Sequence, residues 1–302
     1  MIILKSSLFS VVTKAIGKNL KEEIQQFVES KELNLWGTKK GNEYTKIHVN
    51  LCLYKDMNNI GYYSLWKQIK DWYGNSHKSL CHNIKLVRVA LKQWAKSVVT
   101  IGNLRIWKDV SAQVSKIAVL KKVNLWMDSS DFALKGKSIT LTKDTYWSYK
   151  AQSLGRRYQC IFDAEGRCRA IWGGYSPKVI DSQWVEIYKD ELSTKFQGAH
   201  IIADCHYYAS RNKVPGVKFV TPIPDNVKKV PEDVKSYLGI LDKDKEMNKK
   251  IRNLRARVEA PFAQIQNRFK ALGGTFKDDD TQLDCLVYYA LAIHNKIVDK
   301  TK

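Results

Sequence analysis

Three acidic residues, Asp128, Asp204 and Glu259, lie in settings suited to metal-assisted phosphodiester chemistry. Asp128 ends the strand-like run Val-Asn-Leu-Trp-Met-Asp, and Asp204 ends a similar run, Ala-His-Ile-Ile-Ala-Asp. Glu259 follows Arg-Ala-Arg-Val in a basic helical stretch. Carboxylate oxygens are the ligands that Mg²⁺ prefers, and a pair of such ions can activate a water or hydroxyl while stabilising a leaving oxygen. The residue types and their positions are therefore typical of a two-metal nuclease site.

Only the fold can bring these acids together, because they are too far apart in the sequence to form a local motif. If the strands that end at Asp128 and Asp204 are neighbours in an open α/β sheet, their carboxyl ends lie at the same edge. Each acid alone has an ordinary alternative. A strand-terminal Asp often caps a turn or helix, and a Glu near arginines often lies on a solvated face of mixed charge.

The elements expected around the acids form a mixed α/β sheet. Alternation and β-branched or aromatic content predict strands, Ala164-Glu165-Gly166 predicts a hairpin turn, and helical spacing predicts a helix over Ser182–Phe196. The expected strands are Val123–Asp128, Arg157–Asp163, Arg167–Gly173, Ala199–Asp204 and Val217–Thr221.

The carboxyl-terminal region has the clearest helical pattern. Apolar residues recur every three or four positions from Ile251 to Leu272, and Gly273-Gly274 is a natural helix stop. Pro261 lies inside this pattern and is expected to kink or split the helix. A further amphipathic helix is expected over Cys285–Ile297.

The chain is strongly basic, with 51 Lys and Arg against 30 Asp and Glu, a formal net charge of +21. This surplus favours a polyanionic partner, and nucleic acid is the natural candidate, although anionic membranes and ribosomes attract the same charge. Residues 60–108 are rich in Lys and Arg and predict two helices joined at Gly74-Asn75-Ser76. We interpret them as a helix-turn-helix-like DNA-binding segment, with Lys78, His82, Lys85 and Arg88 on its second helix; the alternative is an ordinary helical hairpin with a basic face.

Other features limit the class of protein. The six cysteines include no C-x-x-C pair, which argues against a zinc finger and favours a reducing compartment. The apolar amino-terminal stretch is interrupted by Lys5 and no cleavage-site pattern follows it, so we do not interpret it as a signal peptide. No run approaches the roughly 18 apolar residues of a membrane span. We therefore expect an intracellular protein without a membrane partner, nuclear in a eukaryote and cytoplasmic or nucleoid-associated in a bacterium.

Four sequence blocks resemble those of DDE transposases, closest to the Harbinger group and its bacterial insertion-sequence relatives. Asp128 in Met-Asp-Ser-Ser is similar to the first block, and Asp204 in Ile-Ile-Ala-Asp-Cys-His-Tyr to the second. Glu259 lies in a block, from Arg255 to Phe269, that is similar to the family's R-x-x-x-E followed by Phe and a basic residue. The sequence Ala-Leu-Ala-Ile-His-Asn, ending at Asn295, resembles the closing helix.

The resemblance implies an RNase H-like catalytic domain over about residues 120–300, preceded by a helical region over 1–115. It implies two Mg²⁺ or Mn²⁺ ions held by Asp128, Asp204 and Glu259, which cleave DNA at transposon ends and join the 3′-hydroxyl ends to target DNA. The basic residues near the third acid, Lys250, Arg252, Arg255 and Arg257, would line DNA, and the segment around residues 60–100 would bind terminal inverted repeats. A homodimer and a separate DNA-binding partner protein are further expectations of the resemblance.

Two departures from the family pattern leave alternatives open. Ala203 precedes Asp204 where the family usually has Gly, and Asp131 is close enough to Asp128 to compete for the first metal position. The chain could be an active transposase, a catalytically silent domesticated DNA-binding protein, or a structure-specific nuclease without strand transfer. The presence of all three acids favours catalysis, because a protein that only binds DNA has no physical need for convergent carboxylates.

Overall fold

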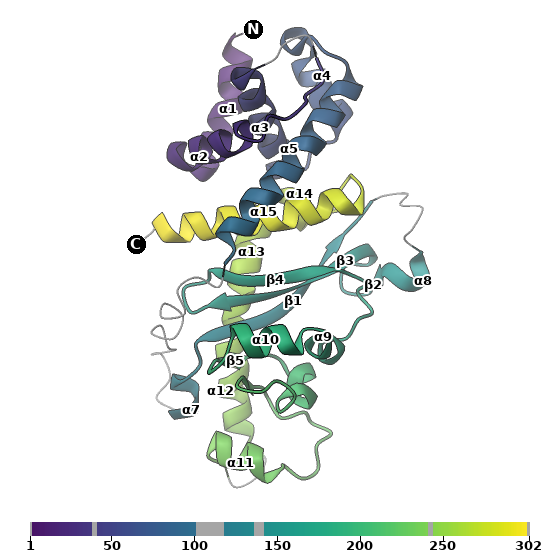
Figure 1. The fold of residues 1–302 in the computed structure, drawn as a ribbon. Coiled ribbons are helices and arrows are strands. Elements are labelled where there is room, and N and C mark those ends of the chain that lie inside the picture. The colour runs from purple at the N-terminus through teal and green to yellow at the C-terminus, as the bar shows by residue number, and fades with distance from the viewer. Residues whose placement is uncertain (1, 38–40, 101–117, 136–141, 241–243, 301–302) are drawn as a thin grey trace. The chain divides into compact units, whose positions relative to one another are not determined.

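A computed structural model describes residues 2–37, 41–100, 118–135, 142–240 and 244–300, and the chain divides into two compact units (Figure 1). The first unit comprises Met1–Val99, Asp131–Arg156 and Ala263–Lys302, and the second comprises Thr100–Ser130 and Arg157–Phe262. Neither unit is one continuous stretch of chain, so the two units do not follow a single boundary in the sequence. The end of the basic window, residues 101–108, lies outside the described residues.

The first unit is built mainly from helices. Its long carboxyl-terminal helix α15 packs against α5, and the buried side chains of α15 are mostly apolar. The other helices of this unit supply the rest of its core. The elements are α1 (Ile2–Ile16), α2 (Lys18–Glu29), α3 (Asn42–Met57), α4 (Tyr62–Tyr73), α5 (His77–Val98), α8 (Lys143–Tyr146), β2 (Trp147–Ser148), α14 (Lys270–Gly273) and α15 (Asp280–Lys300).

The turn between α4 and α5 forms where the sequence predicts it. Gly74 ends α4 in the left-handed conformation, with φ of 72°, which favours glycine. Ser76 caps α5, since its hydroxyl oxygen accepts a hydrogen bond from the backbone N–H of Ser79 at 3.2 Å. The prediction of two helices joined at residues 74–76 is confirmed.

The sheet is mixed. Its strands are β1 (Leu125–Ala133), β3 (Ser153–Asp163), β4 (Cys168–Tyr175), β5 (His200–Ile202) and β6 (Lys218–Val220), together with β2, in the order β2-β3-β1-β5-β6, and β4 pairs with β3. The β3 and β4 strands are antiparallel, whereas β1, β5 and β6 run parallel. The prediction that the first strand ends at Asp128 is wrong, because β1 continues to Ala133. In the described residues, β1 pairs with β5 through Leu125 with Ile201 and Trp126 with Ile202. Asp128 lies two residues beyond the last of these pairs.

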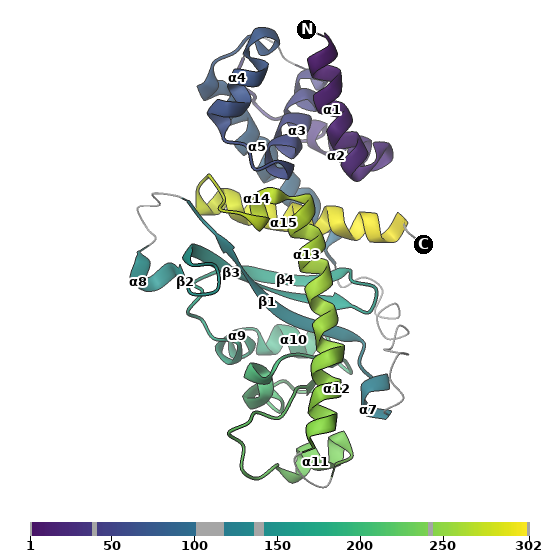
Figure 2. The ribbon, with the colours of Figure 1, turned by 180° about the vertical axis from the view of Figure 1, so that it is seen from behind.

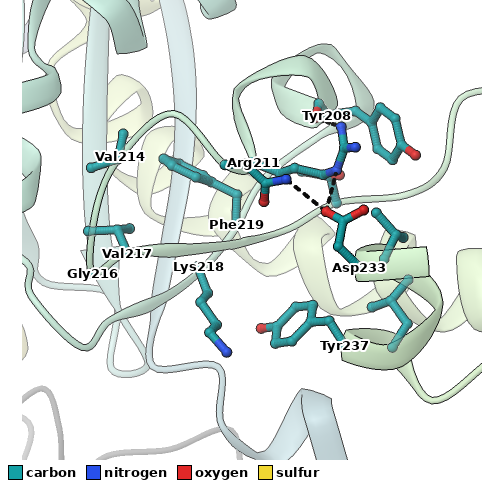
Figure 3. A pocket seen from close by; sticks show the side chains of 13 residues that line it. Tyr208, Arg211, Val214, Gly216, Val217, Lys218, Phe219, Asp233 and Tyr237 are labelled. Atoms are coloured by element: carbon teal, nitrogen blue, oxygen red, sulfur yellow. Dashed lines mark hydrogen bonds and ion pairs between the residues drawn. The ribbon is translucent and has the colours of Figure 1, made fainter. Parts of the chain in front are cut away.

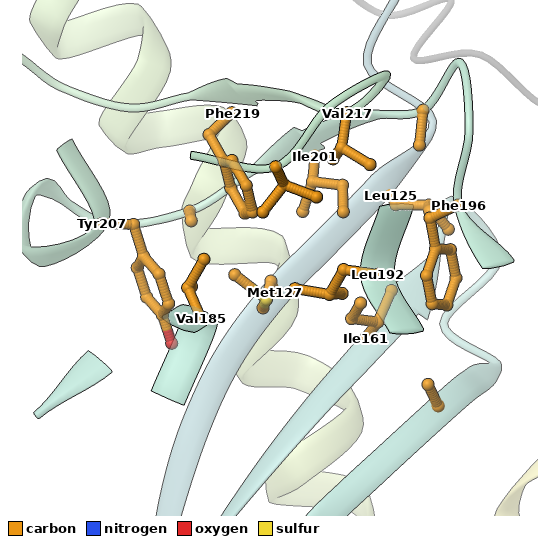
Figure 4. Packing of buried hydrophobic residues seen from close by; sticks show 14 of the residues in the cluster. Leu125, Met127, Ile161, Val185, Leu192, Phe196, Ile201, Tyr207, Val217 and Phe219 are labelled. Carbon is orange, nitrogen blue, oxygen red and sulfur yellow. The ribbon is translucent and has the colours of Figure 1, made fainter. Parts of the chain in front are cut away.

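Helices cover both faces of the sheet in the second unit (Figures 1 and 2). On one face, the short helices α9 (Asp181–Ile187) and α10 (Lys189–Lys195) supply Val185 and Leu192 to the apolar cluster that includes Leu125 and Met127 (Figure 4). Figure 2 shows helix α12 (Lys245–Arg255) on the other face, where the Trp126 indole N–H donates to the carbonyl of Leu254 at 2.9 Å. A single helix was predicted over Ser182–Phe196, but the structure has two helices, α9 and α10, separated at Tyr188.

The long helical pattern near the carboxyl terminus is interrupted before Pro261. Helix α12 ends at Arg255, the 3₁₀ segment η2 (Ala256–Val258) follows, and α13 (Glu259–Arg268) begins at Glu259. Pro261 lies in the first turn of α13, where its missing N–H costs little. The remaining short elements are α7 (Ala118–Lys121), η1 (Cys205–Ser210) and α11 (Glu232–Leu238). Within the described ranges, no helix combines the length and the apolar character that crossing a membrane requires.

Candidate active site

Asp128 is placed by the alternation of β1. Leu125 and Met127 enter the core with α9 and α10, so Trp126 and Asp128 face α12. Asp128 is only 9% exposed. Its Oδ1 accepts a hydrogen bond from the N–H of Ser129 at 2.8 Å, and its Oδ2 accepts one from Arg255 Nη2 at 2.9 Å. A buried carboxylate is thus stabilised by a cation that comes from the neighbouring helix.

Arg255 also binds the third acid. Its Nη1 donates to Glu259 Oε1 at 2.8 Å, so one guanidinium bridges Asp128 and Glu259. The Arg255 side chain is 22% exposed and that of Glu259 is 64% exposed. Both Nη atoms of the Arg255 guanidinium bind carboxylates. These contacts do not support the prediction that Arg255 lines DNA.

Asp204 lies two residues beyond the end of β5, the strand that pairs in parallel with β1. It caps η1, since its Oδ1 accepts the N–H of His206 at 2.7 Å. Capping was the ordinary alternative for this residue, but it uses one of two carboxylate oxygens and does not prevent a second role.

A fourth acid is Asp181 at the start of α9, which the sequence did not identify as a candidate site residue. Burial raises the pKa of Asp181, and the charge of Asp204 raises it further, while Arg157 and a hydrogen bond with Tyr207 act in the opposite direction. Its Oδ1 is buried, and no residue in the described ranges forms a hydrogen bond with it. The only local signal in the sequence was its place at a helix start, which is common for Asp and says nothing of chemistry.

The buried hydroxyl of Tyr207 is subject to the charges of three of these acids. Tyr207 is fully buried, and Gln159 Nε2 donates to its oxygen. Burial raises the pKa of Tyr207, and the charges of Asp181, Asp128 and Asp204 add to the increase. The charges of all three carboxylates therefore act on one phenol, although Asp128 lies on β1 and Asp204 follows β5 by two residues.

The donor set suits a hard divalent cation, although it is not preassembled. Carboxylate oxygens are the ligands that Mg²⁺ and Mn²⁺ prefer, and the Arg255 guanidinium shows that the place between Asp128 and Glu259 favours positive charge. Among the described residues, no three His, Cys, Asp or Glu side chains form a group that could hold a metal ion. Glu259 is the member most able to move, because it is exposed at the first position of α13.

Asp131, the alternative to Asp128, has a different environment. Ser148 donates its hydroxyl to Asp131 Oδ2 at 2.8 Å. Three positions separate Asp131 from Asp128 along β1, and side chains an odd number of residues apart point to opposite faces of a strand. The contact with Arg255 therefore favours Asp128 as the site residue.

The other basic residues near the site are open to solvent. Lys250, Arg252 and Arg257 are all exposed on α12 and η2. They remain available for a phosphate backbone.

The basic residues predicted on α5 differ in their surroundings. Lys78 is exposed, whereas the ring of His82 stacks on Trp36 at 3.7 Å between centroids. Lys85 Nζ donates to Asp279 at 2.8 Å. Arg88 is 0% exposed and pairs with Asp56 and Asp278, so the prediction that Arg88 contacts DNA is wrong: a phosphate has no access to its side chain.

Comparison with protein families finds a matching family model. Residues 127–295 match a family model described as DDE superfamily endonuclease, a span that contains the three acids of the predicted triad. Comparison with curated proteins and with solved structures gives no match.

Proposed function

We propose that this chain, which belongs to the DDE superfamily endonuclease family, is a transposase that cuts DNA at transposon ends and joins the 3′-hydroxyl ends to target DNA. The family usually uses divalent metals. The observation that carries the proposal is the cation-binding character of the site: one guanidinium bridges Asp128 and Glu259, and Asp204 follows, by two residues, the strand that pairs with β1.

The topology supports an RNase H-like core. Antiparallel β3 and β4 lie on one side of β1, and β5 and β6 run parallel to β1 on the other. This arrangement places the carboxyl ends of the parallel strands at one edge, where ligands bind in open α/β sheets.

Asp128, Asp204 and Glu259 are the residues that would hold two Mg²⁺ or Mn²⁺ ions, and Arg255 would release the carboxylates of Asp128 and Glu259 when the ions bind. The bound ions would polarise the phosphodiester and favour the ionised form of the attacking water or hydroxyl. The buried setting of Asp128 fixes its carboxylate against β1 and α12, which limits the reorganisation that catalysis requires.

Exposed basic residues would orient the DNA. Lys250, Arg252 and Arg257 would contact phosphates near the acids, and Lys78 with the α4–α5 hairpin would bind terminal inverted repeats. A homodimer holding two transposon ends, and a partner protein that adds DNA specificity, belong to the same proposal. So does location in the nucleus of a eukaryote or in the cytoplasm or nucleoid of a bacterium.

The test is cleavage of a labelled duplex that carries a transposon end, in Mg²⁺ and in Mn²⁺, by the wild type and by Asp128→Asn, Asp204→Asn and Glu259→Gln. We expect each variant to lose cleavage and to keep its DNA affinity in metal-free buffer. Asp190→Asn, an exposed acid on α10, is the matched control and should cleave normally. Cleavage that survives in all three site variants would refute the proposed site.

A silent DNA-binding protein is the second candidate, favoured by one observation. Arg255 already pairs with two of the three acids, which is an arrangement that a purely structural role would also produce. Wild-type protein that binds the duplex, but neither binds Mn²⁺ nor cleaves, would support this candidate.

A further inference from the structure

A pocket of about 380 Å³ lies beside η1 in the second unit (Figure 3). Its wall includes Tyr208 and Arg211, which follow Asp204 by four and seven residues on and just after the element that Asp204 caps. The opposite part of the wall comes from β6 and α11, including Lys218 and Tyr237. This volume is within the range of small-molecule sites.

Two tyrosines supply aromatic surface and unsatisfied hydroxyl groups. The hydroxyl oxygens of Tyr208 and Tyr237 are buried, and neither forms a hydrogen bond with any residue that the structure describes. A buried hydroxyl without a partner is costly, so a ligand that offers hydrogen-bonding groups would be favoured there. The ring faces are also suited to stacking on a planar heterocycle.

Cations lie against both rings. Arg211 Cζ is 4.5 Å from the ring centroid of Tyr208, and Lys218 Nζ is 5.0 Å from that of Tyr237. Asp233 accepts a hydrogen bond from Asn212 Nδ2 at 2.7 Å and lies 3.5 Å from Arg211 Nε, which orients these polar groups at the pocket rim. The Asn212 bond, together with Arg211, lowers the pKa of Asp233.

We propose that this pocket binds one unpaired nucleotide of the DNA, with its base against the tyrosine rings and its phosphates near Arg211 and Lys218. Aromatic rings, hydrogen-bonding hydroxyls and two cations are the combination that recognises a base together with its charged backbone. The inference rests on the proposed function, because DNA that reaches Asp204 passes the element that carries Tyr208.

The test compares three duplexes that differ at one position, in EDTA so that neither metal nor cleavage contributes. The position holds an unpaired base, an abasic sugar or a normal pair, and affinity is measured by fluorescence anisotropy. We expect wild type to bind the unpaired base about tenfold more tightly than the abasic duplex, since stacking one base is worth about 5- to 150-fold. Tyr237→Leu and Tyr208→Leu should reduce that ratio to near one.

Controls separate the pocket from general effects. Tyr149→Leu removes a highly exposed tyrosine outside the pocket and should keep the tenfold ratio. Should the tyrosine variants fail to fold, Lys218→Ala, an exposed substitution at the pocket, should still weaken binding to the unpaired-base duplex more than to the paired one.

Each other outcome overturns the inference. DNA binding with no preference for the unpaired base, or a preference that the pocket variants retain, would refute the nucleotide subsite while leaving the proposed nuclease site untouched. If deoxynucleoside monophosphate binds wild type and not the pocket variants, yet the duplexes show no preference, the pocket serves a free nucleotide instead of DNA. Binding to none of the duplexes would contradict the proposed function as well.

Discussion

Arg88 in the helical unit and Arg255 in the sheet unit each lie between two carboxylates, and these two arginines differ in burial. In the helical unit, Arg88 is fully buried; it pairs with Asp56 through Nε at 2.9 Å and with Asp278 through Nη1 at 2.7 Å. In the sheet unit, Arg255 pairs with Asp128 and Glu259 and is 22% exposed. The same chemical grouping is therefore locked in one place and open to exchange in the other.

Burial explains the difference. Although burial alone would raise the pKa of Asp56, the charges of Arg88 and Lys55 outweigh it and hold the pKa below its ordinary value. Asp56 also accepts a hydrogen bond from Tyr289. Removing Arg88 would leave a buried charge without compensation, whereas Glu259 can turn to water when Arg255 leaves. An arginine that pairs with two acids stabilises the fold when the group is buried. When one of the acids is exposed, another cation can replace the arginine.

The largest effect is expected when an acid of the open pair is neutralised. Asp128→Asn keeps the shape but removes the charge, and we expect DNA cleavage to fall at least about 1,000-fold, roughly 4 kcal/mol of transition-state stabilisation. Single-turnover cleavage in Mg²⁺ measures it. Asp56→Asn, the equivalent change in the locked pair, should lower stability, and the folded fraction should retain its cleavage rate. Equal losses of cleavage rate in Asp128→Asn and Asp56→Asn would contradict the distinction between the open and the locked pair.

The next effect is on folding. Arg88→Met should destabilise the protein by about 3–5 kcal/mol, because Asp56 loses its main counter-charge in a dry environment. Urea unfolding followed by circular dichroism gives the value. The double variant Arg88→Met/Asp56→Asn should recover part of the loss, and failure to recover any would mean that the arginine acts through packing alone.

Arg255→Met should change stability less than Arg88→Met does, because Glu259 is exposed and only Asp128 is left as a buried acid without its counter-charge. We expect Mn²⁺ affinity to rise about five- to tenfold, since the ion no longer displaces a guanidinium. Calorimetric titration measures this, with Arg257→Met as the matched exposed control. A fall in Mn²⁺ affinity would show that Arg255 organises the site for metal.

A smaller effect is expected from acid. Lys85 and neighbouring hydrogen bonds outweigh burial and lower the pKa of Asp279 to about 2. Because this pKa and that of Asp56 are depressed, their contribution is present above the unfolded value near 3.9 and is lost as pH falls toward 2. Urea midpoints at pH 5, 4 and 3 should decline, and Asp279→Asn should flatten the decline slightly. A midpoint that does not fall between pH 5 and 3 would contradict the linkage.

The sequence predicted local structure better than it predicted contacts between residues far apart in the chain. Gly74 and Ser76 marked the α4–α5 turn because capping depends on residues a few positions apart. The burial of Arg88 could not be read in this way, since its partner Asp278 is 190 residues away and nothing near Arg88 distinguishes it from an exposed basic residue.

In the candidate site too, the sequence identified some residues and not others. Asp128, Asp204 and Glu259 stood out because each lies in a recognisable block, whereas the pairing of Arg255 with Glu259, one helical turn away, was not predicted because Arg255 was assigned to DNA. Asp181 was missed, because its nearness to Asp204 and Tyr207 depends on how α9 packs against η1. The extension of β1 beyond Asp128 was missed because its hydrophobic alternation gives way to Ser129 and Ser130.

The most direct measurement is calorimetric titration of Mn²⁺ into wild type, Asp128→Asn, Asp204→Asn and Glu259→Gln, with folding checked by thermal unfolding. We expect saturable Mn²⁺ binding to wild type that is at least about tenfold weaker in every site variant, while Asp190→Asn binds as wild type does. Identical Mn²⁺ binding by wild type and all three site variants would contradict a metal site built from these acids.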